Sequence, residues 1–272
     1  MEKPEDSQTE GDHLLTLFHA NTRSIKGKTA ELQFLSAEAD IICLTETHLD
    51  ETITNNSILA SENRSMFRRD RNIHGGGVLI AVNETLKPKE VDLTAYKEEV
   101  IAVQIQSRII ICCYYRPHVS LQNTDTIDGF LEYLETCFPR YNILFVGDMN
   151  FPDIIWDKGK GKIKTTSNFK YIHQDFLNVL HRHNMEQIIT APTHILGNTL
   201  DLVCTNNPAY IHSTEVISPG LSDHYLILVQ LQQQVKAFPS LTKKIRLYKR
   251  ADEIAFSEQL QKKNQRRTRG ND

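Results

Sequence analysis

The chain has 272 residues, of which 40% are hydrophobic and 24% are charged, a balance typical of a soluble globular protein. Its acidic, polar start, MEKPEDSQTEGD, excludes a signal or transit peptide, and no apolar run approaches the ~20 residues of a membrane-spanning helix. The net charge is −3, but from Lys236 onward 11 Lys and Arg face 4 Asp and Glu, so an acidic body precedes a basic tail. We therefore expect no membrane partner.

The basic tail has two interpretations, a solvated end or a patch for nucleic-acid contact or nuclear import. The five cysteines are scattered and show no CxxC spacing, which favours reduced, buried thiols over disulfides or a zinc site. These features predict an intracellular protein of the cytosol or nucleus, and we favour the nucleus.

Short apolar runs bounded by turn residues predict strands buried in a sheet. In chain order these runs are 14–20, 41–47, 77–82, 100–105, 109–115, 143–148, 200–205 and 226–231. Apolar residues at helical spacing predict three helices, over 29–40, 125–138 and 167–184. Many strands with few helices favour a four-layer α/β/β/α sandwich, in which two packed mixed sheets are flanked by helices, over an alternating βαβ array.

Three segments follow from this pattern. We predict a disordered acidic leader over 1–12 and one domain over 13–232. We predict a basic tail or connector, largely disordered or helical, over 233–272.

Polar side chains stand at the ends of these runs. They are Asn21, Glu46, Tyr115, Asp148, Asn150, Asp201, Asp223 and His224. Each has an ordinary interpretation, such as a cap, a solvated strand end, a core aromatic or a turn residue. If the strands share a sandwich, however, their ends converge on one rim, where these groups would meet.

Two features of this set favour a functional site. Strand alternation places Asp148 and Asn150 on the same side of their strand. Asp201 lies between Leu200 and Leu202, where an unpaired carboxylate is costly, so a partner is expected. His224 is the natural candidate, because an Asp–His couple fixes the imidazole tautomer.

The motifs N-x-R-S-I, L-T-E-T, Y-R-P, G-D-M-N, L-D-L and S-D-H, in this order, resemble the endonuclease/exonuclease/phosphatase superfamily, which includes apurinic-site and pancreatic-type DNA nucleases. The stretches TETHLD (45–50), GDMNFPDIIWD (147–157) and APTHILGNTLDLVCTN (191–206) are similar to the endonuclease domain of non-LTR (LINE-type) retrotransposons. The resemblance runs from about Leu14 to about Leu231 and implies a DNase-like fold with DNA as the partner.

The segment RLYKRADEIAFSEQL (246–260) resembles the connector that leads into a reverse transcriptase, which a full-length element would encode with this domain. The chain ends at Asp272 without one. A truncated element, a domesticated gene and a gene-model fragment all remain open.

The resemblance implies phosphodiester hydrolysis with Mg²⁺, for which Mn²⁺ is a possible substitute. Glu46 is expected to be the main metal ligand, with Asn21 beside it and Asp223 supporting this or a second metal position. Asp148 would orient and deprotonate the attacking water, and Asn150 would hold water or a phosphate oxygen. Mg²⁺ prefers such oxygen ligands.

The remaining roles concern the phosphate and the DNA. His224, oriented by Asp201, would donate a hydrogen bond or proton to the phosphate, and Tyr115 would contact a phosphate oxygen. Arg23 and Arg116 lie near the motif loops and are candidates for DNA contacts, although each is equally interpreted as an ordinary surface charge.

The function predicted first is therefore a metal-dependent endonuclease that nicks one DNA strand, as in target-site cleavage by non-LTR retrotransposons. Two alternatives remain. One is a phosphoesterase of the same fold acting on a phosphorylated lipid or inositol, and the other is a domesticated, non-catalytic nucleic-acid-binding protein. The stretches 147–157 and 191–206 favour the retrotransposon branch over the first alternative, and the intact set of eight polar residues argues against the second.

Overall fold

In the computed structural model, the described residues are 13–59, 63–106, 108–117, 123–157, 159–217 and 221–235. They form two six-stranded sheets and a two-stranded hairpin. The predicted leader and most of the predicted tail lie outside these ranges, so the predicted domain limits stay predictions. Within the described ranges, no helix is long and apolar enough to cross a membrane.

The first sheet has the strand order β13-β14-β1-β2-β4-β3. Its strands are β1 (His13–Asn21), β2 (Ile41–Thr45), β3 (Arg64–Arg69), β4 (Val78–Asn83), β13 (Ile211–Ile217) and β14 (Leu226–Val235). β1 and β2 run parallel, whereas the other neighbours pair antiparallel, so the sheet is mixed. Two short 3-10 helices flank its strands: η1 (Glu84–Leu86) directly follows β4, and η2 (Pro208–Tyr210) directly precedes β13.

The second sheet has the order β11-β12-β8-β7-β6-β5 and is also mixed, because β7 and β8 are parallel. Its strands are β5 (Lys89–Val91), β6 (Glu99–Ile105), β7 (Ile109–Tyr115), β8 (Asn142–Asp148), β11 (Glu186–Gln187) and β12 (Asp201–Thr205). A separate hairpin, β9 (Ile154–Asp157) with β10 (Lys160–Ile163), follows β8.

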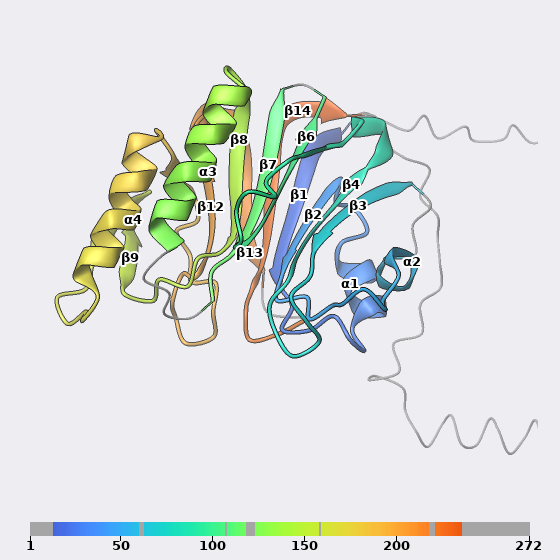
Figure 1. Ribbon diagram of the computed structural model, residues 1–272, viewed down its shortest axis with the longest axis horizontal. Helices are drawn as coiled ribbons and strands as arrows, with labels where there is room; N and C mark the ends of the chain where they lie inside the picture. The colour runs from blue at the N-terminus through green and yellow to red at the C-terminus, as the bar shows by residue number, and fades with distance from the viewer. Residues whose placement is uncertain are drawn as a thin grey trace, which may run out of the picture. The chain divides into compact units, whose positions relative to one another are not determined.

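Helices cover the outer faces of both sheets (Figure 1). α1 (Thr29–Leu35) and α2 (Asn55–Ile58) lie on the side of the first sheet, and α3 (Asn123–Cys137) and α4 (Lys170–Arg182) on the side of the second. Three buried apolar clusters fill the layers, one between the sheets and one between each sheet and its helices. The predicted four-layer α/β/β/α sandwich is confirmed.

All eight predicted strands are present, but the sequence did not reveal β3, β5, β9, β10, β11 and β13. Most of these are short or lie at sheet edges. β3 and β13 lack fully buried residues, so neither shows the apolar run by which the central strands were recognised. The helix predicted over 29–40 ends at Leu35. Cys137 at the end of α3 is exposed, whereas the other four cysteines are buried as predicted.

The topology brings polar strand ends to one rim. β1 and β2 are parallel and end side by side, with Asn21 opposite Thr45. β7 and β8 do the same in the other sheet, with Tyr115 opposite Asp148. β12 runs the other way, so its first residue, Asp201, pairs with Asp148.

Candidate active site

Asn21 joins the two sheets at this rim. Its Nδ2 donates one hydrogen bond to Glu46 Oε1 and another to Asp148 Oδ2, both at 2.9 Å. The backbone N–H of Arg23 donates to Asn21 Oδ1 at 3.1 Å, which fixes the amide in this orientation. Asn21 was expected to be a metal ligand, but here it faces the carboxylates with a donor nitrogen. In this arrangement it holds Glu46 and Asp148 together.

Glu46 follows β2 in a left-handed backbone conformation, with φ of 50°. Such a conformation costs a non-glycine residue about 1–3 kcal/mol and clusters at functional sites. Its carbonyl oxygen accepts hydrogen bonds from Thr22 Oγ1 at 2.9 Å and from the backbone N–H of Ser24 at 2.8 Å. The loop after β1 therefore holds the strained turn that presents the Glu46 carboxylate.

Asp148 is the last residue of β8 and is buried. Its Oδ1 accepts a hydrogen bond from the backbone N–H of Asn150 at 3.0 Å, and Asn150 has a left-handed φ of 52°. The prediction that Asp148 and Asn150 lie on the same side assumed that the strand continues to Asn150. The strand ends at Asp148, so its alternation does not place the Asn150 side chain. Asn150 fixes the Asp148 carboxylate through its backbone, while its own amide approaches the Arg116 carbonyl oxygen at 3.5 Å.

The two arginines predicted as DNA contacts differ. Arg116 is 4% exposed, donates to the Asn150 carbonyl oxygen at 3.2 Å and stacks with its guanidinium carbon 4.2 Å from the centroid of Phe151. These contacts hold the turn after β8 and do not suit an exposed DNA contact. The Arg23 side chain is 57% exposed and forms an ion pair with Asp223, so its DNA contact stays a prediction.

The expected couple of Asp201 and His224 is formed. His224 Nδ1 lies 2.7 Å from Asp201 Oδ2, and both residues are buried. The carboxylate accepts, so Nδ1 donates and the ring's Nε2 is the nitrogen left for a ligand. Among the described residues, no hydrogen bond engages that Nε2.

The electrostatics of the rim favour a cation. Burial, followed by the charge of Asp201, raises the pKa of Asp148 to about 8. Burial also acts to raise the pKa of Asp201, but the charges and hydrogen bonds of His224 and His19 outweigh it and lower that pKa. For His224, burial acts to lower the pKa, but the charge and hydrogen bond of Asp201, together with the charges of Asp148 and Asp223, outweigh it and raise the pKa to about 9. The couple is therefore an ion pair, whereas no ion pair within the described residues engages Asp148.

Tyr115 ends β7 and is buried, with the guanidinium carbon of Arg71 5.9 Å from the centroid of its ring. Burial, the charges of Glu46 and Asp148 and a hydrogen bond to Glu46 raise the pKa of the Tyr115 hydroxyl far above its ordinary value. The phenol therefore stays protonated at the rim and can donate a hydrogen bond.

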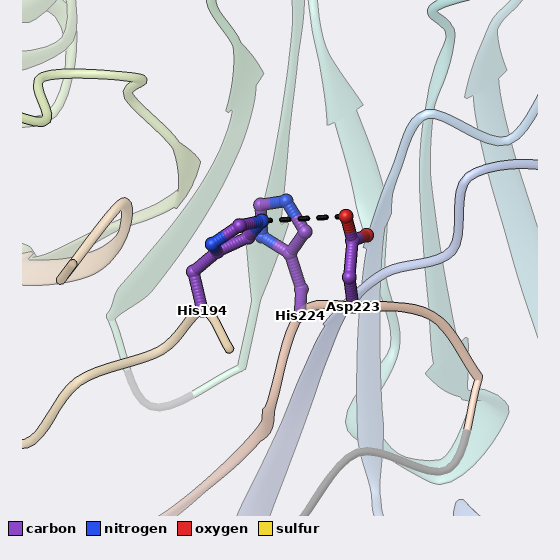
Figure 2. Close-up of side chains that lie close together, drawn as sticks. All are labelled: His194, Asp223 and His224. Atoms are coloured by element: carbon purple, nitrogen blue, oxygen red, sulfur yellow. Dashed lines mark hydrogen bonds and ion pairs between the residues drawn. The ribbon is translucent and has the colours of Figure 1, made fainter. Parts of the chain in front are cut away.

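Asp223 belongs to a second cluster, with His194 and His224 (Figure 2). His194 Nε2 lies 3.3 Å from Asp223 Oδ2, and the rings of His194 and His224 meet edge to face at 4.8 Å. The backbone N–H of Leu196 donates to His194 Nδ1 at 3.2 Å, so the proton of the neutral ring is on Nε2 and is donated to Asp223. As arranged, His194 is a hydrogen-bond donor to Asp223, and Nε2 is not open to a metal.

Asp223 was expected to support a metal. Its carboxylate is engaged by His194 and by Arg23. Burial acts to raise the pKa of Asp223, but the charge of Arg23, with smaller contributions that include His224 and His194, outweighs burial and lowers that pKa. Its position beside Arg23 links it to the loop that follows Asn21. The role of Asp223 as a metal ligand stays a prediction.

The donor set at the rim nevertheless fits a hard divalent cation. Glu46 and Asp148 contribute carboxylate oxygens from different sheets, held together through Asn21. Mg²⁺ is bound through one or two carboxylates and keeps several of its waters. The raised pKa of the buried Asp148 is the mark of uncompensated negative charge that a cation would relieve.

Sequence reasoning missed three residues of this rim. His19 is hydrogen-bonded to Asp201. Thr193 Oγ1 accepts a hydrogen bond from the backbone N–H of Asp201 at 3.0 Å. His194 is hydrogen-bonded to Asp223. His19 stands two residues before Asn21, so strand alternation would have placed both on one side of β1. Thr193 and His194 lie in a loop whose path the sequence does not reveal.

Two mixed sheets packed face to face, with a histidine–aspartate couple and further carboxylates at one rim, agree with the resemblance to the endonuclease/exonuclease/phosphatase superfamily noted in the sequence. Residues 109–228 match the model of a family described as endonuclease-reverse transcriptase. The resemblance found in the sequence is thus confirmed. No curated protein gives a significant match to the chain.

Solved structures agree on the fold. The endonuclease domain of TRAS1, a telomere-specific non-LTR retrotransposon, is similar with a TM-score of 0.61 at 17% identity, over 80% of this chain and 98% of that one. An AP endonuclease from Archaeoglobus fulgidus gives 0.61 at 14% identity, over 81% and 100%. The 3′ phosphatase NExo from Neisseria, bound to a product DNA hairpin, gives 0.59 at 16% identity, over 80% and 100%.

Proposed function

We propose that the chain is a Mg²⁺-dependent DNA endonuclease that nicks one strand, of the kind that cleaves target sites for non-LTR retrotransposons. The observation that carries the proposal is the junction at Asn21, which joins Glu46 of one sheet to Asp148 of the other. The Asp201–His224 ion pair stands beside it, because Asp201 pairs with Asp148 in register. The family match supports the same activity.

Asp148 is the proposed general base. A general base works best when its pKa lies near the operating pH, and burial raises the pKa of Asp148 to about 8. The Asn150 N–H and the Asn21 amide hold its two oxygens, so the carboxylate keeps one orientation toward an attacking water.

His224 is the proposed donor to the phosphate. Its raised pKa keeps the ring protonated at neutral pH, and Asp201 engages Nδ1, so Nε2–H is the group that would face a phosphate oxygen. The protonated phenol of Tyr115 is proposed as a further donor to a phosphate oxygen.

Glu46 is the proposed principal holder of Mg²⁺, aligned by Asn21, and Asp223 is the proposed support. When bound, Mg²⁺ would neutralise charge on the phosphoryl oxygens and favour departure of the 3′ oxygen. The exposed Arg23 beside Asp223 is a cation that an approaching DNA backbone would meet. DNA in the nucleus is the proposed partner, with a reverse transcriptase encoded alongside in a full-length element.

The test is an incubation with supercoiled plasmid and Mg²⁺, beside an incubation with inositol phosphates and phosphoinositide vesicles. We expect conversion of supercoiled to nicked plasmid and no release of phosphate. Phosphate release without nicking would favour the lipid or inositol phosphoesterase. Binding of DNA without either reaction would favour the non-catalytic alternative.

A further inference from the structure

His19 is a buried imidazole in an apolar layer. Leu15 and Leu17, which precede it at strand spacing on β1, belong to the apolar cluster between the two sheets. The next position of this series, His19, is 0% exposed. An aliphatic side chain there would continue the layer without a polar group, so the imidazole requires partners that offset its loss of hydration.

Both ring nitrogens of His19 have such partners. Nδ1 lies 3.1 Å from the carbonyl oxygen of Cys43 on β2, and Nε2 lies 3.1 Å from Asp201 Oδ1 on β12 of the other sheet. The carbonyl oxygen only accepts, so Nδ1 donates to it. A proton must also lie between Nε2 and Oδ1. Both ring nitrogens of His19 are therefore hydrogen-bonded, Nδ1 to a strand of its own sheet and Nε2 to a strand of the opposite sheet.

The Asp201 carboxylate is divided between two imidazoles. Oδ2 accepts a hydrogen bond from His224 Nδ1 at 2.7 Å, and Oδ1 is hydrogen-bonded to His19 Nε2 at 3.1 Å. Among the described residues, no other side-chain donor forms a hydrogen bond with Oδ1. Without His19, the plane of the carboxylate would be held only through His224, the group that it has to orient.

We propose that His19 is a positioning residue for DNA cleavage: it holds Asp201 from across the sheet interface, and Asp201 in turn holds His224 toward the scissile phosphate. His19 itself touches no substrate, because both nitrogens are occupied and the side chain is buried. The proposal rests on the proposed endonuclease function and adds to it a residue that none of the sequence motifs contains. Partners that orient a reactive group from behind commonly change activity 10–100-fold when removed.

The test compares two variants of one position with a packing control. His19→Leu removes both donors and keeps an aliphatic side chain, whereas His19→Gln keeps an amide N–H at about the reach of Nε2. Leu17→Ala removes packing from the same layer and leaves the polar contacts intact. Initial nicking rates are measured against plasmid concentration at a temperature where melting curves show every variant folded.

We expect His19→Leu to lower kcat about 10–100-fold while KM for plasmid changes less than about twofold, because substrate contacts are unchanged. His19→Gln should recover most of kcat, and Leu17→Ala should keep kcat close to wild type despite a lower melting temperature. An unchanged kcat in His19→Leu, an equal loss in Leu17→Ala, or no recovery in His19→Gln would overturn the proposal.

A second measurement does not depend on cleavage. Nitrogen-15 NMR of the histidine rings reports the tautomer of His224 and the signal of its Asp201-bound Nδ1–H. We expect His19→Leu to broaden or shift that signal and His19→Gln to keep it. An unchanged His224 signal in His19→Leu would refute the positioning role even in a chain that cleaves nothing, whereas failure of the endonuclease function would appear as an absence of nicking by the wild-type chain.

Discussion

His183 and His224 both form hydrogen bonds with carboxylates, but only His224 keeps a ring nitrogen for a ligand. His183, at the end of α4, places Nδ1 2.9 Å from Glu135 Oε2 and Nε2 2.8 Å from Asp128 Oδ1, both on α3. His224 places Nδ1 2.7 Å from Asp201. Both nitrogens of His183 are thus used in joining two helices, whereas His224 retains one for a ligand.

Burial separates the two clusters further. The side chains of Asp128 and Glu135 are 30% and 38% exposed, so water solvates them with or without His183. Asp201 is 0% exposed and lies opposite Asp148 in the register of β12 and β8. Burying a carboxylate costs its hydration. That cost is accepted at functional sites where the carboxylate orients a neighbouring group and favours its protonated form, as Asp201 does for His224. A paired histidine can act directly on a ligand only when it keeps one ring nitrogen without a partner, as His224 does among the described residues.

The largest effect that would test this contrast is expected at Asp148. Asp148→Asn keeps the size of the side chain but removes the proposed base, so nicking should fall by roughly 10²–10⁴-fold. The variant loses one of the two hydrogen bonds that the Asp148 oxygens accept, but it also removes a buried ionisable group, so we expect only a small change in melting temperature. Plasmid nicking and thermal denaturation check both outcomes. Asp157→Asn, an exposed carboxylate of the β9–β10 hairpin, is the control that should stay at the wild-type rate.

The second effect is a change in pH dependence at Asp201. Against the effect of burial, the acidic neighbours of His224 raise its pKa to about 9, with Asp201 contributing most, so the protonated ring is lost only as the pH rises through that value. Asp201→Asn removes the largest of the charges that raise the pKa of His224 and leaves burial opposed only by Asp148 and Asp223, so that pKa falls toward its ordinary value of about 6.5. The alkaline fall in nicking should move to lower pH.

The measurement is a profile of nicking rate between about pH 6 and pH 10 at fixed Mg²⁺. At pH 8 the variant should be at least about tenfold slower, since His224 would be mostly neutral there. Profiles of equal shape, merely scaled by a constant, would show that Asp201 does not set the protonation of His224.

The smallest effect on activity is expected at the cluster of His183, Asp128 and Glu135, which joins α3 and α4 and is called the helix cluster below. His183→Ala leaves Asp128 with Arg182 and removes hydrogen bonds between α3 and α4, so we expect a loss of about 1–3 kcal/mol in the free energy of unfolding. For a domain of this size that corresponds to a melting temperature lower by roughly 2–12 °C. Nicking at a temperature where the variant is folded should stay within about twofold of wild type.

His181→Ala, at an exposed position of the same helix, is the matched control and should change neither quantity. If His183→Ala lost nicking at a temperature where it is fully folded, the helix cluster would have to act on the active site. That result would contradict the view that His183 only joins two helices whereas His224 acts in cleavage.

The sequence predicted most of the fold and the convergence of the site, because both depend on buried strands. Apolar runs located every central strand, and their polar ends identified Glu46, Asp148 and Asp201 before any strand pairing was known. The pairing of Asp201 with His224 was predictable too, since a carboxylate inside an apolar strand needs a partner.

What the sequence did not reveal depends on orientation and on loops. Asn21 meets Glu46 with its donor nitrogen because the Arg23 N–H occupies its oxygen, which no motif encodes. Arg116 is buried on Phe151, although it follows an apolar run as an exposed arginine would. His19 looks like one more member of a buried strand, and its contact with Asp201 spans 182 residues of sequence.

The central claim is that carboxylates from both sheets form one divalent-ion site for DNA cleavage, and the rate of plasmid nicking as a function of Mg²⁺ tests it most directly. The wild-type chain should be inactive in excess EDTA, regain nicking as Mg²⁺ is added beyond the chelator, and require far more Mg²⁺ when Glu46→Gln is introduced. Nicking that persists in excess EDTA, or an Mg²⁺ dependence that Glu46→Gln leaves unchanged, would contradict the account.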